Sequence, residues 1–240
     1  SYTMESRART FNNYIFHLVS PYIVYKENPP RTREINYRAL WEKVTGTVFC
    51  WLLAHLILEH YMLPKLKLIR TVSLPDLVLD IFPSIVLPTI FAYIVLFLLM
   101  FEFWLGALAE ALKLEERQFF SDWWNSSSFD EFSRKWNIPI HLFIKKHVYK
   151  VMLERFKWTR GSSYFTCFVI SAMLHEFVMW AALGQRLRHP PVIFVFQMLQ
   201  IPLTWLATVI SRCSPHLANM FFWFGMIFGP PLITVLYIRL

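Results

Sequence analysis

The sequence is poor in charge: Asp, Glu, Lys and Arg make up 17% of its 240 residues, against roughly 25% in a typical soluble domain. Apolar residues take their place, with 56% hydrophobic and 18% aromatic side chains. The charge that remains is basic, with a formal net charge of +8. We therefore expect a membrane protein whose basic residues face anionic lipid or an anionic, phosphate-bearing substrate.

Several classes of protein lack their signatures here. Cys50, Cys167 and Cys213 are too few and too far apart for a zinc site or a disulfide framework, so we expect small buried thiols. There is no Gly-x-Ser-x-Gly elbow, and Met179 stands where a zinc protease would need a second histidine after His175. No nucleic-acid-binding signature is present, and most basic residues flank apolar stretches. We expect neither a metal ion nor a nucleic-acid partner.

Long apolar stretches account for much of the chain, and a membrane span needs about 20 apolar residues. The candidate spans are residues 41–63, 80–112, 163–183, 191–210 and 217–238. Pro83 and Pro88 predict an irregular start to the second span, and its Glu102 and Glu110 should face the protein interior. The pattern predicts an all-α fold, a polytopic transmembrane helical bundle that forms a single domain over residues 1–240. Because the chain begins with Ser1 and opens without a signal peptide, we expect a piece of a longer protein.

Polar segments separate these spans. Residues 1–40 are polar, and their prolines should break any long helix, with residues 21–33 forming an extended segment or loop at the membrane surface. Residues 64–79 should form a short connection. Within the polar residues 113–162, residues 136–151 have the pattern of an amphipathic helix that lies in the interface or begins a tilted helix. Most loop Lys and Arg residues fall in 1–40 and 113–162, so both should be mainly cytosolic or interfacial. The glycosylation acceptor sequence at residues 125–127 would then stay unmodified.

His175 lies inside an apolar stretch, next to Glu176. Ionisable groups within a span are costly and are usually functional, and histidine is the side chain best suited to move protons near neutral pH. We interpret His175 as a general base that assists direct attack by a substrate hydroxyl, a role worth roughly 10²–10⁴ in rate. The alternative is an interior histidine that only helps helices to pack.

A compact aromatic and polar cluster, FFSDWWN at residues 119–125, follows the second apolar stretch. Trp123 and Trp124 could be interface anchors, but that role does not explain the flanking Asp122 and Asn125. Asn125 can donate and accept hydrogen bonds, so it could hold a thioester carbonyl or a catalytic imidazole. Asp122 is expected to be a structural hydrogen-bond acceptor. We predict that this cluster helps to hold an activated acyl donor.

Other polar groups carry weaker signals. Gln197 and Gln200 interrupt an apolar stretch, and are either interhelical hydrogen-bond partners or contacts to a polar substrate group. His141 lies four residues after Asn137, on the same face of a helix, and His147 lies beside basic residues; both are expected at the surface or the membrane interface.

The FFSDWWN cluster resembles the FYxDWWN signature of membrane-bound O-acyltransferases of the sterol and diacylglycerol type, with Phe120 in place of the tyrosine. The resemblance covers nearly the whole chain. It continues through WNIPIH at 136–141, HVY at 147–149, HEF at 175–177, QMLQIPL at 197–203 and GPP at 229–231. The chain looks like the C-terminal portion of such an enzyme, without the family's N-terminal spans.

This resemblance implies that His175 is the catalytic base and that Asn125 assists it. It implies an acyl-CoA site that we assign to Phe119, Phe120, Asp122, Trp123 and Trp124, and we expect contacts to the acceptor at Gln200 and Glu176. The family fold encloses a reaction chamber, with cytosolic access for acyl-CoA and lateral access for the lipid alcohol. Members are multi-pass proteins of the endoplasmic reticulum membrane that form homo-oligomers, usually dimers or tetramers.

The choice of acceptor rests on finer similarities. Residues 132–139 and 25–34 look most like fungal sterol acyltransferases, and Pro230 stands where diacylglycerol enzymes carry glutamine. We therefore expect a sterol O-acyltransferase that makes steryl esters, as in ergosterol metabolism, with no cofactor because acyl-CoA is a substrate. Arg134, Lys145 and Lys146 are expected to attract the CoA phosphates. The alternatives are diacylglycerol acylation, which gives triacylglycerol, and a non-enzymatic lipid-binding or channel-like protein.

Overall fold

The computed structural model describes residues 11–24, 26, 29–115, 117–183 and 191–239. Within these ranges the chain is helical, and its strand-like pairing is limited to an isolated antiparallel bridge between Arg31 and Leu114. Five helices are long and apolar enough to cross a membrane: Tyr37–Leu68, Leu74–Ala111, Arg160–Ala181, Val192–Cys213 and Pro215–Arg239. The predicted all-α bundle of membrane-spanning helices is confirmed, and the chain is a membrane protein.

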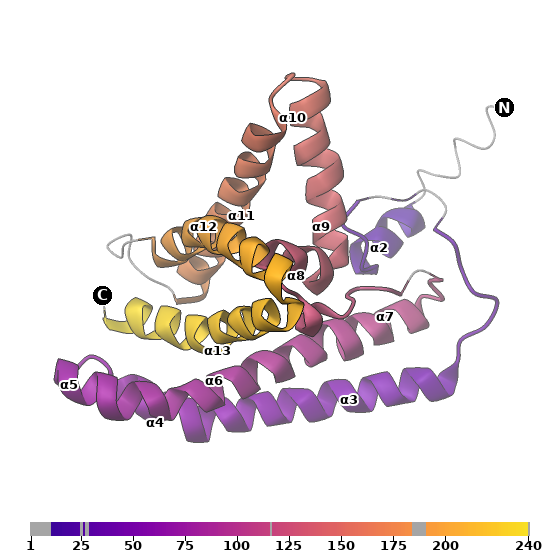
Figure 1. Cartoon of the computed structure of the whole chain (residues 1–240). Helices are drawn as coiled ribbons and strands as arrows, with labels where there is room; N and C mark the ends of the chain where they lie inside the picture. The colour runs from indigo at the N-terminus through magenta and orange to yellow at the C-terminus, as the bar shows by residue number, and fades with distance from the viewer. Residues whose placement is uncertain (1–10, 25, 27–28, 116, 184–190, 240) are drawn as a thin grey trace.

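Two long helical arms lie antiparallel along the bottom of Figure 1. The first arm consists of α3 (Tyr37–Leu56), the π-helical segment η1 (Ile57–Met62) and α4 (Leu63–Leu68). The second consists of α5 (Leu74–Asp76), the π-helical η2 (Leu77–Ile81), α6 (Phe82–Phe97), the π-helical η3 (Leu98–Trp104) and α7 (Leu105–Ala111). The second arm is thus one irregular span, as its length and prolines predicted.

The expected connection over residues 64–79 is wrong, because the helices continue into it and only residues 69–73 join the two arms. Pro64 has no N–H to donate within a helix, and its ring would clash with the carbonyl four residues earlier. The π-helical η1 ends directly before α4, so Pro64 falls in the first turn of α4, where a missing N–H costs little. Pro75 and Pro83 occupy the same place in α5 and α6.

The N-terminal segment holds a helix that the sequence reasoning did not predict, α2 (Phe11–Val19), which ends just before Pro21. An extended stretch follows, and it pairs with the chain after α7. Thr32 N donates to Lys113 O at 2.8 Å, and Glu115 N donates to Pro30 O at 3.1 Å. Tyr25, at the start of the stretch that favoured a sterol enzyme, lies outside the described residues.

The two carboxylates of the second arm both have protein partners. Glu110 is 2% exposed, accepts a hydrogen bond from Asn36 N at 2.7 Å and forms an ion pair with Arg117. Glu102 forms an ion pair with Lys43 of α3. Both side chains therefore face the protein, as predicted, and Glu110 fastens the start of α3 to the end of α7.

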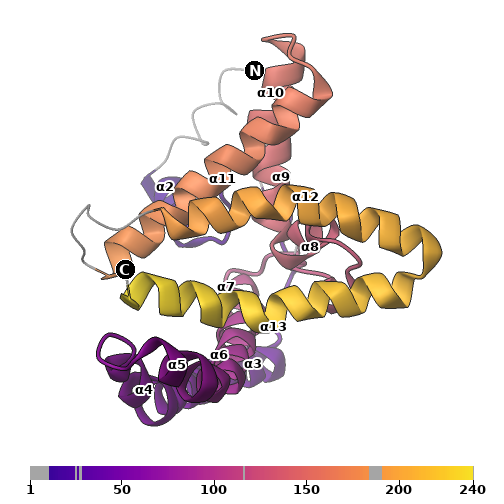
Figure 2. The same ribbon diagram turned by 60° about the vertical axis from the view of Figure 1, so that its left-hand side comes forward.

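The second half of the chain forms an inverted V above a pair of antiparallel helices (Figures 1 and 2). One limb follows α8 (Phe129–Trp136) and consists of α9 (Ile138–Ile144), the π-helical η5 (Lys145–Tyr149) and α10 (Lys150–Glu154). The other limb is α11 (Arg160–Leu183), and the lower pair is α12 (Val192–Cys213) and α13 (Pro215–Arg239), with α13 packed on α6. The helix predicted over residues 136–151 is present, except that Asn137 breaks it and caps α9 through Oδ1.

All three cysteines are free. Cys50 is buried and Cys167 is half-buried, but Cys213 is exposed, so the expectation of buried thiols is wrong there. Cys213 is the last residue of α12, where the helix ends and the chain turns into α13.

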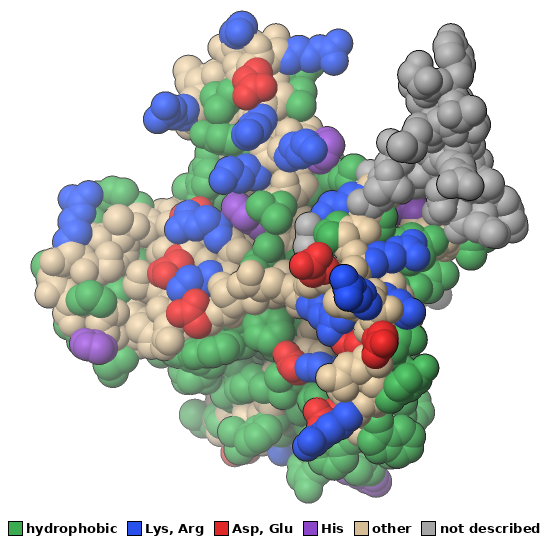
Figure 3. Space-filling view, turned by 90° about the vertical axis from the view of Figure 1, so that its right-hand side faces the viewer, with side chains coloured by type: hydrophobic (Ala, Val, Ile, Leu, Met, Phe, Trp, Pro, Cys, Tyr) green, Lys and Arg blue, Asp and Glu red, His purple; other side chains and the backbone are tan. Residues whose placement is uncertain are grey.

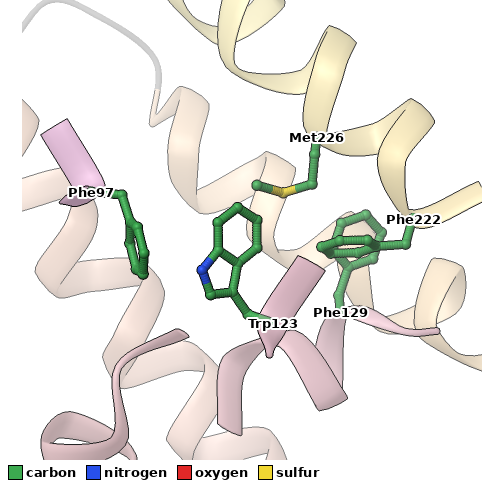
Figure 4. Close-up of a cluster of buried hydrophobic side chains, with 5 residues drawn as sticks. All are labelled: Phe97, Trp123, Phe129, Phe222 and Met226. Carbon is green, nitrogen blue, oxygen red and sulfur yellow. The ribbon is translucent and has the colours of Figure 1, made fainter. Parts of the chain in front are cut away.

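An aromatic core joins the two halves of the molecule. Its buried members are Phe97 of α6, Trp123, Phe129 of α8, and Phe222 and Met226 of α13 (Figure 4). Phe222 is fully buried and its ring lies 5.7 Å from that of Phe129, centroid to centroid. Aromatic pairs of this geometry contribute about 0.5–1.5 kcal/mol beyond the area they bury. The core therefore fixes residues 119–125 relative to α6, α8 and α13.

Candidate active site

Residues 119–125 form a tight turn beside α8. The last three residues make a short 3₁₀ helix, η4 (Trp123–Asn125). Ser121 N donates to Lys135 O at 2.9 Å, and Ile138 N donates to Phe119 O at 2.9 Å. The backbone of the turn is thereby tied to the end of α8 and the beginning of α9.

The two tryptophans of the turn point into different surroundings. Trp123 is 4% exposed, and its ring packs edge-on against Phe97 and Trp136, with centroid distances of 5.2 and 4.8 Å. Trp223 of α13 lies 5.9 Å from it on another side. Trp124 is 44% exposed. Trp123 is therefore a core residue that holds the turn, whereas Trp124 presents its ring outward; contact of either ring with acyl-CoA stays a prediction.

The two phenylalanines also pack inside the protein. Phe119 is 6% exposed and lies in a buried cluster with Ala109 and Leu114. Phe120 meets Phe97 edge-on at 4.9 Å.

A cavity of about 270 Å³ borders both phenylalanines. Its charged lining groups are Lys43, Glu102, Glu110 and Arg117, and these four form two ion pairs with each other. The cavity therefore offers a phosphate no uncompensated positive charge.

Helix α13 also holds the turn through polar side chains. Asn219 Nδ2 donates to both Trp124 O and Ser126 O at 2.9 Å, and Trp223 Nε1 donates to Trp124 O at 2.9 Å. These donors lie four residues apart, on one face of the helix. Sequence reasoning missed Asn219; the available signal was a lone asparagine one turn before a tryptophan in an otherwise apolar stretch.

A charged network fastens the exposed edge of the turn. Lys135 Nζ lies 3.1 Å from Asp122 Oδ1 and 2.9 Å from Glu131 Oε1. Glu131 also accepts a hydrogen bond from Ser127 N at 2.8 Å. Burial acts to raise the pKa of Glu131, but the hydrogen bonds from Lys135 and Ser127 outweigh it and hold that pKa below its ordinary value. Asp122 thus has the structural acceptor role expected of it.

Asn125 presents its side-chain amide at the end of the turn, without a hydrogen bond to any described residue. Its backbone N donates to Asp122 O at 3.1 Å, and its side chain is exposed. No hydrogen bond joins it to His175 among the residues described, so the structure does not bring the two predicted catalytic side chains into direct contact. The amide can still bind a substrate carbonyl.

His175 stands on α11 with its ring exposed and its tautomer set by its own helix. Nδ1 lies 2.7 Å from Ser171 O and 3.4 Å from Ser171 Oγ. A carbonyl oxygen only accepts hydrogen bonds, so the short contact requires the proton to be on Nδ1 when the ring is neutral. The lone pair is then on Nε2, and no described residue occupies that atom. A neutral imidazole in this state can take a proton from a hydroxyl group.

Glu176 joins three helices. Its Oε1 accepts from the Tyr237 hydroxyl at 2.6 Å, and its Oε2 accepts from Phe194 N at 3.1 Å. Tyr237 also accepts from Ile193 N at 3.2 Å. The first N–H groups of a helix have no partner within it, and Pro191 provides no side-chain cap for α12. Glu176 and Tyr237 therefore cap α12 from neighbouring helices, and the contact of Glu176 with the acceptor stays a prediction.

The two glutamines of α12 differ in their surroundings. Gln197 Nε2 donates to Ser171 Oγ of α11 at 2.9 Å, so the interhelical alternative describes this side chain. Its Oε1 is buried and has no partner within the described ranges. Gln200 is half-buried without a hydrogen bond to any described residue, and its contact with the acceptor stays a prediction.

Basic side chains gather on the upper limb formed by α9, η5 and α10, as Figure 3 shows. Lys145, Lys146 and His147 of η5 are exposed. Arg134 of α8 forms an ion pair with Asp130 instead of standing alone. His141 is half-buried; burial and then the positive charges of Lys145 and Arg134 hold its pKa below the ordinary value. The limb therefore carries three exposed lysines, Lys145, Lys146 and Lys150, against one carboxylate, Glu154.

The described part of the chain contains no group of three or more His, Cys, Asp or Glu side chains placed to hold a metal ion. The expectation that the reaction needs neither metal nor cofactor stays a prediction.

Comparison with known proteins bears on the whole chain. The model of MBOAT, the membrane-bound O-acyltransferase family, matches residues 7–239. Probable sterol O-acyltransferase 1 of Schizosaccharomyces pombe is 34% identical over 235 residues, which are 95% of this chain and 43% of that protein. Sterol O-acyltransferase 2 of Saccharomyces cerevisiae is 32% identical over 232 residues, 91% of this chain and 35% of that protein.

A relative with another named acceptor is similar over the same region. Diacylglycerol O-acyltransferase 1 of Dictyostelium discoideum is 30% identical over 240 residues, 95% of this chain and 36% of that protein. The chain spans less than half the length of each of these three relatives.

Proposed function

The chain belongs to the membrane-bound O-acyltransferase family, and on that premise we propose that the protein transfers a long-chain fatty acyl group from acyl-CoA to a sterol hydroxyl. The products are a steryl ester and free CoA. The observation that carries the proposal is the 2.7 Å contact from His175 Nδ1 to Ser171 O, which leaves Nε2 as a free base. The names of the fungal sterol O-acyltransferases at 30–34% identity support the choice of acceptor.

The proposed reaction is a single acyl transfer assisted by a base. Nε2 of His175 removes the proton of the sterol hydroxyl while the oxygen attacks the thioester carbon. The tetrahedral intermediate collapses by breaking the carbon–sulfur bond, and the departing thiolate of CoA takes the proton back from His175. General-base assistance of this kind contributes roughly 10²–10⁴ in rate.

Asn125 is proposed to bind the thioester carbonyl. Its exposed side chain has no hydrogen bond to His175, so it is free to donate to an oxygen on which negative charge develops. Three separate anchors fix the turn that carries it: the aromatic core, the α13 donors and Lys135. Such fixation reduces the rearrangement needed when the substrate binds.

The positive limb is proposed to attract the phosphates of acyl-CoA through Lys145 and Lys146, with Arg134 contributing beside its partner Asp130. Acyl-CoA is a cytosolic substrate, so the limb would lie on the cytosolic face of the endoplasmic reticulum membrane. Assembly into a homo-oligomer, a dimer or a tetramer, forms part of the same proposal by analogy with the family.

Diacylglycerol is the second candidate acceptor, because the Dictyostelium relative named for it is similar over 95% of this chain. Microsomes that carry the full-length protein, supplied with labelled oleoyl-CoA, ergosterol and diacylglycerol together, separate the candidates. Labelled steryl ester above the level of empty-vector microsomes is the expected result. Labelled triacylglycerol alone would overturn the sterol assignment, and the absence of both products would overturn the acyltransferase proposal.

A further inference from the structure

Gln197 and His175 are connected through one serine. Gln197 Nε2 of α12 donates to Ser171 Oγ at 2.9 Å. Ser171 lies one helical turn before His175 on α11, and its carbonyl oxygen lies 2.7 Å from His175 Nδ1. The Ser171 hydroxyl lies farther from the same nitrogen, at 3.4 Å. The carbonyl oxygen and the hydroxyl of Ser171 therefore compete for Nδ1 of the imidazole, and Gln197 contacts the hydroxyl.

Packing alone does not account for a glutamine at position 197. Its Oε1 is buried with no partner in the described ranges, and a buried acceptor without a partner costs free energy. Methionine has a similar length and would bring no polar atom to the same contact between α11 and α12. The glutamine amide therefore carries a free-energy cost that a methionine at the same contact between α11 and α12 would avoid.

We propose that Gln197 is a positioning residue that, by holding the Ser171 hydroxyl, keeps the proton of neutral His175 on Nδ1. A hydroxyl can donate to Nδ1 as well as accept, whereas a carbonyl can only accept. The amide N–H donates to Oγ and thereby holds that oxygen 3.4 Å from Nδ1, so that the carbonyl oxygen, at 2.7 Å, is the stronger partner of the ring. Released from Gln197, the hydroxyl turns and donates to Nδ1. The ring proton then moves to Nε2, and the lone pair that acts as base is lost.

This inference rests on the proposed acyl transfer, and a double-mutant cycle tests it separately. Initial rates are measured in microsomes carrying the full-length protein as Gln197→Met, Ser171→Ala, the double variant and wild type. We expect Gln197→Met to lower kcat about 10-fold, with KM for oleoyl-CoA changed less than about 2-fold. In the Ser171→Ala background the hydroxyl that could donate to Nδ1 is absent, so the same Gln197→Met change should cost less than about 2-fold.

Thr208→Val is the matched control on α12, because among the described residues the Thr208 hydroxyl bonds only to Thr204 O of its own helix, at 2.8 Å. It should leave the rate unchanged. An equal loss from Gln197→Met in the wild-type and Ser171→Ala backgrounds would overturn the inference, because that is how a simple packing defect behaves. Absence of ester from wild type would instead overturn the proposed function. Rates are normalised to folded protein, so a loss of expression is not read as a loss of kcat.

Discussion

Replacing Gly225 by alanine should test how tightly α13 packs against α8. A Cβ added at Gly225 would lie 2.6 Å from Phe129 Cζ, well inside ordinary van der Waals contact. The Phe129 ring has little freedom to move aside, because it is buried and packs against Phe222 at 5.7 Å. The substitution therefore introduces a clash at the core that positions residues 119–125.

Two opposing effects set the size of this change. Gly→Ala inside a helix stabilises by about 1 kcal/mol through helix propensity, and overpacking of a filled core costs about 1–3 kcal/mol. Gly161 of α11 is the matched control, since nothing lies within 4 Å of a Cβ placed there. Gly225→Ala should therefore be about 1–3 kcal/mol less stable than Gly161→Ala. At about 2–4 °C per kcal/mol for a chain of this size, its Tm should lie about 2–12 °C lower.

The assay is thermal unfolding of detergent-solubilised protein, followed by tryptophan fluorescence. A second pair of variants isolates the contact: in a Phe129→Leu background the atom that clashes is gone, and Gly225→Ala should no longer lower the Tm. Equal melting of Gly225→Ala and Gly161→Ala would refute the reasoning, because it would mean that α13 does not approach α8 as closely as the structure places it.

Three further predictions concern the polar contacts around the site. Asn219→Asp removes two hydrogen bonds to the turn and should destabilise the fold by about 1–3 kcal/mol. Met220→Ala, at a position 67% exposed, should not, and equal Tm values for the two variants would contradict the α13 contacts. Tyr237→Phe removes a cap of α12 and should lower the stability by about 1 kcal/mol. Amide hydrogen exchange at the start of α12 should then become faster, and unchanged exchange would contradict this capping. The folded pKa of Glu131 lies below its unfolded value, so its stabilisation is full above about pH 4.3 and is lost as pH falls through the folded pKa. Glu131→Gln should remove the part of the acid sensitivity of Tm that comes from Glu131. A dependence of Tm on pH identical to that of wild type would contradict the lowered pKa of this carboxyl group.

The spans were readable from the sequence, but their boundaries were not. Each predicted span coincides with one of the five described helices that are long and apolar enough to cross a membrane. Pro64 misled the reasoning because a proline ordinarily ends a helix, whereas a π-helical turn placed it in the first turn of the next segment. The helix at Phe11–Val19 is short, and its neighbouring prolines pointed to a loop.

The chemistry of the candidate site was easier to find than its supports. His175 and residues 119–125 stand out because polar groups are rare in apolar stretches. Asn219 and Tyr237 act on groups 93–95 and 61 residues away, respectively, and no local pattern reveals a partner at that distance. The separate surroundings of Trp123 and Trp124 could not be read either, because adjacent residues diverge only once the turn is packed.

The most direct measurement compares wild type with His175→Ala in microsomes carrying the full-length protein and labelled oleoyl-CoA, with His216→Ala as the control on α13. Esterification should fall roughly 10²-fold or more in His175→Ala and stay at the wild-type level in His216→Ala. Undiminished ester formation by folded His175→Ala protein would contradict the assignment of His175 as the base.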